Sequence, residues 1–264
     1  MNTVDKVSYI INTYNRPTGL KLAINSVLKQ DFNDIEIIVV DDFSSVNLSE
    51  ELVSLYGGRI VFIRNPTNLG LARSRQIGLE KTSNEYICFL DDDDVIIDPL
   101  KTLKEHEVLG SDESIAVVCS NIIEVRNGIK TLGSIDWPHN KLALKKHFYK
   151  RNGIIYPSTT MVRKSSLISV GGFDFDFKRG IDSDVYRRLL IANYNIAFID
   201  APTIEYLVIA DDKITDNKSK KGLENDLSSH IRTIRKYWKA YVFQPSALLY
   251  RLKSIMKDVY LLCK

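Results

Sequence analysis

Apolar residues follow two different spacings along the chain. Short runs of β-branched and aromatic residues at 7–11, 35–40, 59–63 and 86–90 predict strands. The near-continuous β-branched run at 35–40 is typical of a strand buried on both faces. Between these runs, apolar residues recur three or four positions apart, which predicts helices. The first helix begins at Pro17, where a missing N–H costs little. Four strand–helix units in succession predict an α/β fold with a mixed, mainly parallel central sheet flanked by helices.

The later part of the chain has a more mixed pattern. Its predicted helices lie at 98–103, 141–150 and 182–192, its predicted strands at 115–125 and 196–199, and a short strand or loop at 157–162. Asn127-Gly128 predicts a hairpin turn, because both residues readily adopt positive φ. The charged segment at 211–221 predicts a linker. Two basic helices separated by Pro245 are predicted to follow it.

Composition places the chain among ordinary globular proteins. It has 264 residues, of which 44% are hydrophobic and 26% charged. The three cysteines, Cys88, Cys119 and Cys263, are odd in number and far apart, which argues against a disulfide framework or a zinc site. The N-terminus lacks the pattern of a signal peptide, and no apolar run reaches the roughly 18 residues of a membrane-spanning helix. We therefore expect a cytoplasmic protein.

Four successive aspartates, Asp91 to Asp94, directly follow the apolar run at 86–90. Adjacent carboxylates repel one another, so a chain tolerates such a cluster when it is fully solvated or when a cation neutralises it. Carboxylate oxygens suit hard divalent ions such as Mg²⁺ or Mn²⁺. From the tetrad alone, two interpretations remain open: a metal site, or a solvated acidic turn that also caps the next helix.

Polar residues follow three of the predicted parallel strands. These residues are Thr13, Tyr14, Asn15 and Arg16 after the first strand, Asp41 and Asp42 after the second, and the tetrad after the fourth. Because the carboxyl ends of parallel strands meet at one edge of a sheet, we expect these groups to share a cleft that suits a nucleotide. The chain has neither a P-loop nor a Gly-x-Gly-x-x-Gly motif after the first strand, which argues against a P-loop nucleotidase or a dinucleotide oxidoreductase.

A second group of carboxylates lies downstream. Its members are Asp174, Asp176, Asp182 and Asp184, followed by Arg187 and Arg188. Asp182 falls near the predicted start of a helix, where the helix dipole favours an anion. On spacing alone, Asp182 is either an N-cap without chemistry or a functional carboxylate.

Six segments of the chain resemble the family 2 glycosyltransferases of the GT-A fold, a large bacterial group that builds O-antigens and capsules. They are residues 10–17, 26–30, 38–44, 68–75, 85–94 and 171–188, in the order that the family has them. The resemblance implies a Rossmann-like GT-A catalytic domain at 1–215, with a nucleotide-binding half at 1–94 and an acceptor-binding half at 95–215. Residues 216–264 are then expected to form a linker and a basic, amphipathic helical tail.

The resemblance also implies a donor site. Its members are Thr13, Tyr14, Asn15, Arg16, Asp42, Arg75, Asp91 and Asp92. Thr13 and Tyr14 match positions that contact the nucleoside, and Asp42 matches the position that contacts the uracil ring. Arg75 is expected near the donor, and Asp92 near the ribose or the sugar.

The same resemblance implies the chemistry. Asp91 to Asp93 match the DxD-type signature of the family, with Asp93 and Asp91 as ligands of Mn²⁺ or Mg²⁺. Asp182 matches the catalytic base, which takes the proton from the acceptor hydroxyl in an inverting single displacement.

The chain departs from the family pattern at two places. Many relatives carry Glu where this chain has Ile181, and Asp184 is a candidate to compensate for it. Many relatives also carry a histidine after the last strand that reaches the metal. This chain has none there, which leaves Asp211, Asp212 or Lys213 as candidate replacements.

The C-terminal tail is basic. Residues 229–264 carry a net charge of +7, which leaves −4 for the rest of the chain. The apolar residues that follow helical spacing here are Leu248, Leu252, Ile255, Val259 and Leu262. Two interpretations remain open: a helix that lies on an anionic membrane, or an ordinary helix packed on the catalytic domain. Nucleic-acid binding is disfavoured because the body of the protein is acidic.

These features predict an inverting, metal-dependent glycosyltransferase of surface polysaccharide synthesis. We expect it to move a hexose from a UDP-sugar to a sugar acceptor on a lipid diphosphate, at the cytoplasmic face of the inner membrane. One alternative is a sugar-1-phosphate nucleotidyltransferase, although the glycine-rich, basic loop of that class is absent. Another is a non-catalytic nucleotide-sugar-binding subunit of a glycan assembly complex, against which the intact Asp182 and Arg188 argue.

Overall fold

The computed structural model describes residues 6–133, 135–150, 153–207 and 219–263. The chain divides into two compact units. The first consists of Met1–Ile135, Ile155–Phe173 and Tyr194–Val208, and the second of Asp136–Ile154, Asp174–Asn193 and Ile209–Lys264. This division differs from the predicted boundary at 215, because the second unit includes two segments from the middle of the chain as well as the tail.

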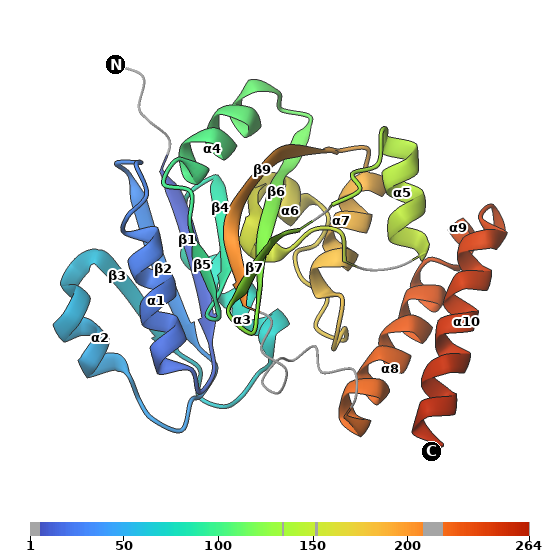
Figure 1. Ribbon diagram of the computed structural model, residues 1–264, viewed down its shortest axis with the longest axis horizontal. Coiled ribbons are helices and arrows are strands. Elements are labelled where there is room, and N and C mark those ends of the chain that lie inside the picture. Colours follow the sequence, from blue (N-terminus) through green and yellow to red (C-terminus); the bar gives the residue numbers. More distant parts are fainter. Residues whose placement is uncertain (1–5, 134, 151–152, 208–218, 264) are drawn as a thin grey trace. The chain divides into compact units, whose positions relative to one another are not determined.

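The first unit is built on one sheet (Figure 1). Its strands are β1 (Val7–Thr13), β2 (Ile35–Asp41), β3 (Ile60–Arg64), β4 (Tyr86–Asp91), β5 (Asp94–Ile96), β6 (Ile115–Arg126), β7 (Ile129–Leu132), β8 (Thr160–Arg163) and β9 (Asn195–Leu207). They follow the order β3-β2-β1-β4-β8-β6-β9-β5, with β7 paired to β6. Neighbours from β3 to β4 are parallel, whereas β8 runs antiparallel to both β4 and β6. The predicted mixed α/β sheet is therefore confirmed.

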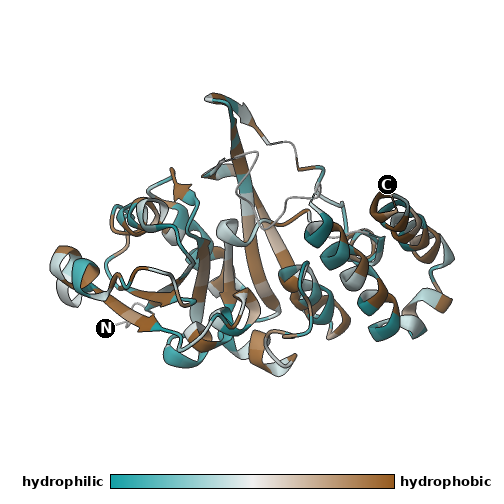
Figure 2. Cartoon of the chain, turned by 90° about the horizontal axis from the view of Figure 1, so that it is seen from below, coloured by the Kyte–Doolittle hydropathy of each residue, from teal (hydrophilic) through white to brown (hydrophobic). Residues whose placement is uncertain are grey.

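Helices pack on both faces of this sheet. They are α1 (Pro17–Val27), α2 (Ser49–Tyr56), α3 (Leu71–Lys81), α4 (Lys101–Ser111) and α6 (Lys164–Ser169). Tyr9 of β1 shares a buried cluster with Leu20 of α1 and Leu109 of α4, whereas the next residue, Ile10, lies against Gly78 of α3. Successive side chains of a strand point to opposite faces, so both faces of β1 are buried. Figure 2 shows hydrophobic residues along the strands and mixed colours on the helices.

The second unit is helical in its described residues. Its helices are α5 (Lys141–Lys150), α7 (Ile181–Ile191), α8 (Lys220–Lys236), α9 (Trp238–Val242) and α10 (Pro245–Leu262). Two buried arginines close the C-terminus of α5: Arg187 donates to the carbonyl of Phe148 at 2.8 Å, and Arg251 donates to that of Tyr149 at 3.0 Å. These bonds satisfy carbonyls that a helix end leaves unpaired, and they place positive charge at the negative end of the helix dipole.

Differences from the predicted elements have local causes. The short strand β5 was not predicted, because three residues carry too little periodicity. β9 extends beyond the predicted 196–199, since it pairs with β6 and β5 as far as Leu207. The structure has three C-terminal helices where two were predicted, because α8 ends before Tyr237 and α9 begins after it. The hairpin at Asn127 and Gly128 is confirmed, with φ of 52° and 77°. The predicted linker falls largely on 208–218, outside the described residues.

Candidate active site

The ends of β1, β2 and β4 lie side by side at one edge of the sheet, as the sequence predicted. In register, Thr13 pairs with Asp41 of β2, and Asn12 pairs with Asp91 of β4. The Thr13 hydroxyl donates to Asp92 Oδ2 at 2.7 Å. The polar segment after the first strand and the tetrad after the fourth are therefore in direct contact.

The four aspartates of the tetrad have different surroundings. Asp92 and Asp94 are 6% and 2% exposed, whereas Asp91 and Asp93 are partly exposed. One carboxylate oxygen each from Asp91, Asp93 and Asp94 lie within 4.8 Å of one another. An all-oxygen donor set at this spacing fits a hard divalent cation such as Mg²⁺ or Mn²⁺. Asp94 is therefore a third candidate ligand beside Asp91 and Asp93, the two predicted from the sequence.

Asp94 owes its position to contacts that are distant in sequence. It pairs with Tyr206 of β9, and its carboxylate accepts a hydrogen bond of 2.5 Å from the Ser158 hydroxyl. Ser158 in turn accepts a hydrogen bond from the backbone N–H of Asp91 at 3.0 Å. The only sequence signal for Asp94 was its membership of the tetrad, and Ser158 had no local signal at all.

Arg16 lies against the tetrad. Its Nη1 is 3.2 Å from Asp92 Oδ1 and 3.1 Å from Asp93 Oδ2. The pKa of Asp92 is raised to about 6, chiefly by burial. The Thr13 hydrogen bond and the Arg16 charge oppose this rise, whereas the charges of Asp93 and Asp91 add to it. Arg16 therefore offsets part of the negative charge of the tetrad.

Arg75 is also placed at the tetrad. It is 1% exposed, and its Nη2 donates to Asp91 Oδ1 at 2.8 Å. Its guanidinium lies 5.6 Å from the centroid of the Phe89 ring, where a cation–π contact is favourable. The side chain of Asp91 is thereby held from the α3 side of the sheet.

Asp42 is buried at the adjacent strand end. Its carboxylate accepts hydrogen bonds of 2.8 Å from the backbone N–H groups of Leu69 and Gly70, and a third of 2.8 Å from Asn65 Nδ2. These bonds fix the loop that leads into α3. The expected contact between Asp42 and a uracil ring stays a prediction.

Tyr14 and Asn15 differ in what they offer a ligand. Tyr14 is 49% exposed, so about half of its surface is accessible to a ligand. Asn15 has φ of 57°, and its Oδ1 accepts a hydrogen bond of 2.8 Å from the N–H of Ser45, while its own N–H donates to Ser44 Oγ at 2.9 Å. Asn tolerates this left-handed conformation better than most residues. Asn15 therefore joins the loops after β1 and β2.

Asp182 belongs to the second unit. It lies in the first turn of α7, whose N-cap is Gly180 with φ of 68°. The interpretation of Asp182 as an N-cap is therefore wrong. Asp182 is partly exposed, whereas Asp184, two positions later, has no exposed surface. The proposed metal-side replacements, Asp211 and Asp212, lie outside the described residues.

Solved structures define the class of this fold. The S. aureus TarS fragment 1–349, solved with UDP-GlcNAc, matches with a TM-score of 0.67, 22% identity and coverage of 87% of this chain and 66% of that one. The mannosyltransferase PcManGT from Pyrobaculum calidifontis, solved with GDP-Man and Mn²⁺, matches with a TM-score of 0.66, 15% identity and coverage of 97% and 75%. The fold is that of the GT-A enzymes.

The family follows from the sequence. The profile of Glycosyl transferase family 2 matches residues 8–171, and the chain belongs to this family. An uncharacterized glycosyltransferase of Methanocaldococcus jannaschii, MJ1057, is 26% identical over 238 residues, which cover 88% of this chain and 79% of that protein. The Escherichia coli UDP-Glc:alpha-D-GlcNAc-diphosphoundecaprenol beta-1,3-glucosyltransferase WfgD is 36% identical over 91 residues, which cover 34% of this chain and 36% of the enzyme. The match thus spans about a third of that enzyme's length. The family supports a glycosyltransferase rather than the nucleotidyltransferase alternative.

Proposed function

We propose that the protein is an inverting, metal-dependent glycosyltransferase that moves a hexose from a UDP-sugar to a sugar acceptor on a lipid diphosphate, in surface polysaccharide synthesis. The observation that carries the proposal is the group of three carboxylate oxygens from Asp91, Asp93 and Asp94 at the carboxyl edge of the sheet. The Escherichia coli relative is named for a UDP-Glc donor and a diphosphoundecaprenol-linked acceptor, which supports this choice of substrates.

The donor side of the reaction is assigned to the first unit. The exposed ring of Tyr14 stacks on the nucleoside base, and Thr13 orients the carboxylate of Asp92 toward the ribose or the sugar. Asp91, Asp93 and Asp94 hold the divalent cation, which when bound supplies positive charge against the departing diphosphate. Arg75 fixes the position of the Asp91 carboxylate.

The acceptor side is assigned to Asp182. As general base, it takes the proton from the acceptor hydroxyl while the hydroxyl oxygen bonds to the anomeric carbon. The bond from that carbon to the diphosphate oxygen breaks in the same step, and UDP leaves with the electron pair. The configuration at the anomeric carbon is therefore inverted, and no covalent sugar–enzyme intermediate forms.

A direct assay tests this proposal. The protein, UDP-sugars, Mn²⁺ and a lipid-diphosphate GlcNAc or GalNAc acceptor are expected to yield a disaccharide whose new bond is inverted, as read by NMR. Asp93→Asn and Asp182→Asn are each expected to abolish turnover, whereas Asp34→Asn, an exposed aspartate between α1 and β2, serves as the matched control. Full activity of Asp182→Asn would assign the base elsewhere. Metal-dependent UDP binding without any transfer would favour the non-catalytic subunit.

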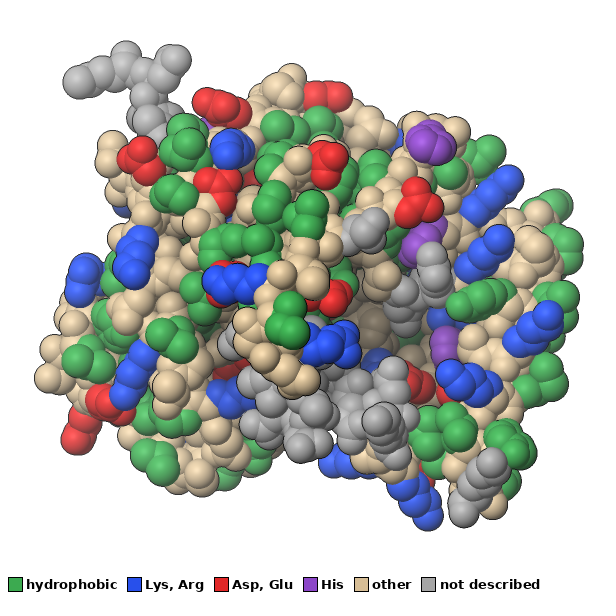
Figure 3. All heavy atoms as spheres, in the orientation of Figure 1, with side chains coloured by type: hydrophobic (Ala, Val, Ile, Leu, Met, Phe, Trp, Pro, Cys, Tyr) green, Lys and Arg blue, Asp and Glu red, His purple; other side chains and the backbone are tan. Residues whose placement is uncertain are grey.

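We also propose that α9 and α10 contact an anionic membrane surface. The large apolar residues exposed on these two helices are Trp238, Val242, Leu249, Tyr250, Leu252, Met256, Val259, Tyr260 and Leu261. Lys239, Lys253 and Lys257 are exposed among them, and the one acidic residue of this stretch, Asp258, is buried. Figure 3 shows hydrophobic and basic side chains intermixed over the C-terminal helices. Apolar residues flanked by cations suit an anionic lipid surface.

Helix α10 has both buried and exposed residues. Ala247, Arg251 and Asp258 of α10 are buried, so one side of the helix packs within the second unit. Leu252 and Val259, which belong to the predicted apolar stripe of α10, are exposed. None of the helices in the described ranges is long and apolar enough to cross a bilayer.

Vesicle sedimentation tests this second proposal. Vesicles with phosphatidylglycerol are expected to bind the protein, and neutral phosphatidylcholine vesicles to bind it much less. The double variant Lys253→Ser, Lys257→Ser is expected to bind the anionic vesicles more weakly, whereas the pair Lys220→Ser, Lys221→Ser at the start of α8 is the control. Equal binding to both lipids, or to neither, would contradict a charge-assisted membrane contact.

A further inference from the structure

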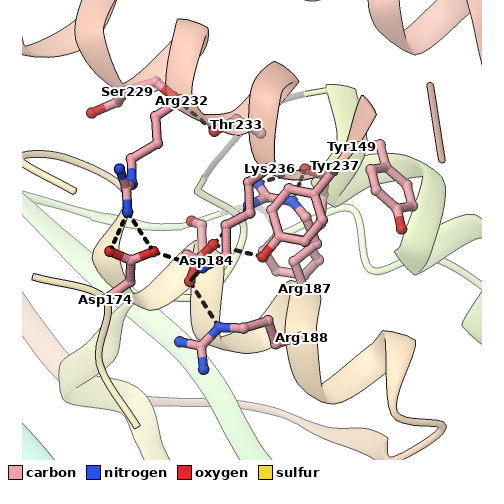
Figure 4. A network of polar contacts seen from close by, with 12 residues as sticks. Tyr149, Asp174, Asp184, Arg187, Arg188, Ser229, Arg232, Thr233, Lys236 and Tyr237 are labelled. Carbon is pink, nitrogen blue, oxygen red and sulfur yellow. Dashed lines mark hydrogen bonds and ion pairs between the residues drawn. The ribbon is translucent and has the colours of Figure 1, made fainter. Parts of the chain in front are cut away.

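Lys236, in the last turn of α8, joins two aspartates that bracket the proposed base (Figure 4). Its Nζ lies 2.7 Å from Asp174 Oδ2 and 2.9 Å from Asp184 Oδ2. The segment between these two aspartates contains Asp182. A single ammonium group thus connects the beginning of this base-bearing segment, residues 174–184, with the first turn of α7.

Further residues of α8 hold the same segment. Arg232 Nη2 lies 2.8 Å from Asp174 Oδ1 and 2.7 Å from Asp176 Oδ2. Arg179 donates from Nη1 to Asp226 Oδ2 at 2.8 Å. The base-bearing segment is therefore attached to α8 at its start, in its middle and at its end.

The attachment at Asp184 is buried. Asp184 has no exposed surface, and its carboxylate accepts hydrogen bonds from Tyr237 Oη at 2.6 Å and from Arg188 Nε at 2.8 Å, besides that from Lys236. The guanidinium of Arg187 lies 5.0 Å from the centroid of the Tyr237 ring. Burial and the charge of Asp184 raise the pKa of Tyr237 well above its usual value, so Tyr237 keeps its proton and remains a donor. A buried carboxylate needs such partners, because an unmatched one is costly.

We propose that Lys236 and Tyr237 are positioning residues for Asp182, and that α8 is therefore part of the catalytic apparatus. This inference rests on the proposed role of Asp182 as the base. Asp182 and Asp184 share the first turn of α7, so contacts that immobilise Asp184 also immobilise the backbone of Asp182. Neither positioning residue lies within residues 8–171, which match the family profile.

The physical reason is the narrow geometry of proton transfer. A general base must lie within hydrogen-bond reach of the hydroxyl that it deprotonates. A displacement of about 1 Å in such a group costs on the order of 100-fold in rate. The segment that leads into α7 contains Gly180 with φ of 68°, and its attachments to α8 restrict the paths that this segment can take.

The experiment compares Lys236→Met and Tyr237→Phe with Arg235→Met, which removes an exposed cation from the same turn of α8. A soluble acceptor is used, so that membrane contact does not enter. Both positioning variants are expected to lower kcat about 10- to 100-fold, with the KM for the UDP-sugar and the calorimetric affinity for UDP unchanged. Lys236→Arg, which keeps a donor and the charge, is expected to restore most of kcat. Arg235→Met is expected to match the wild type.

Amide hydrogen exchange provides a readout that does not depend on activity. Lys236→Met is expected to exchange faster in residues 174–184, with the strands of the first unit unchanged. Faster exchange there without any loss of kcat would overturn the positioning role. A loss of kcat accompanied by an equal loss in Arg235→Met, or by weakened UDP binding, would overturn it as well.

Asp182→Asn is measured in parallel to separate the two proposals. If it abolishes turnover while Lys236→Met and Tyr237→Phe keep the wild-type kcat, the proposed function stands and the positioning role fails. If Asp182→Asn retains full turnover, the assignment of the base fails and the positioning inference fails with it. Should Lys236→Met not fold, Tyr237→Phe, which removes one hydroxyl group, still decides the question.

Discussion

The hydroxyl of Thr13 donates a 2.7 Å hydrogen bond to the buried carboxylate of Asp92. This bond joins the end of β1 to the end of β4, and Arg16 from the same loop reaches Asp92 and Asp93. The loop after β1 and the aspartate tetrad therefore form one charged assembly. Changes on either side are expected to affect both stability and donor binding.

Thr13→Val removes this donor while nearly keeping the side-chain shape. Asp92 loses a hydrogen bond in a buried setting, so we expect the free energy of unfolding to fall by about 1.5–3 kcal/mol, the usual range for a bond to a charged group. UDP affinity is expected to fall as well, whereas Thr13→Ser preserves both. Denaturant unfolding and calorimetry with UDP measure the two effects. Wild-type stability in Thr13→Val would show that the bond is not formed in solution.

Gly19 in the first turn of α1 lies directly against the backbone of the tetrad. A Cβ at this position would lie 2.3 Å from the carbonyl oxygen of Asp92, and backbone cannot move aside as a flexible side chain does. Gly19→Ala is therefore expected to cost about 1–3 kcal/mol of stability and to weaken Mn²⁺ binding. Gly58→Ala is the control, since its Cβ would meet open space. Equal melting temperatures for the two variants would contradict this close approach.

Asp94 is expected to act as a metal ligand together with Asp91 and Asp93. Asp94→Asn keeps the side-chain volume but removes the charge, so the affinity for Mn²⁺ in the presence of UDP is expected to fall by about 10-fold or more. Calorimetry compares it with Asp93→Asn and with the exposed control Asp34→Asn. An unchanged Mn²⁺ affinity in Asp94→Asn alone would remove Asp94 from the ligand set.

His230 is expected to make the second unit sensitive to acid. Burial and the charge of Arg251, whose Nη1 lies 2.9 Å from His230 Nδ1, lower the pKa of His230 to about 4. Asp258 lies 3.8 Å from Nε2, but burial raises the pKa of that carboxyl, which weakens its opposing effect. The unfolded chain, with a histidine pKa of about 6.5, therefore binds more protons than the folded one between pH 6.5 and 4.

Stability is consequently expected to fall as the pH is lowered through this window. Titration of His230 is expected to lower the free energy of unfolding by about 2 kcal/mol between pH 7 and pH 5. In His230→Asn, the side-chain oxygen can still accept a hydrogen bond from Arg251 but does not titrate. The stability of this variant is therefore expected to fall by about 2 kcal/mol less than that of the wild type between pH 7 and pH 5. Urea unfolding of both proteins at the two pH values gives the difference, and identical pH dependences would show that His230 titrates normally.

Much of the fold could be predicted because its signals are local. The runs that became β1, β2 and β4 are mostly apolar, as is typical of strands buried on both faces. The polar residues behind each run, such as Thr13, Asp42 and Asp91, then had to lie at one edge, because parallel strands end on the same side. The helix at Pro17 and the hairpin at Asn127 likewise depend on a single residue's backbone preference.

The tertiary structure alone decided how these side chains interact. Asp94 joins the oxygen group because β5 pairs with β9, a strand more than a hundred positions away. Ser158 reaches Asp91 and Asp94 from the short helical turn Pro157–Thr159, which lies between β5 and β9 in sequence. Lys236 meets Asp174 and Asp184 only through the packing of α8. Periodicity reports which face of an element is buried, whereas a distance between charges depends on the path of the backbone between them. The sequence by itself therefore determined the parallel part of the sheet, the edge where its polar residues meet, and the family. The packing determined which charged side chains lie together.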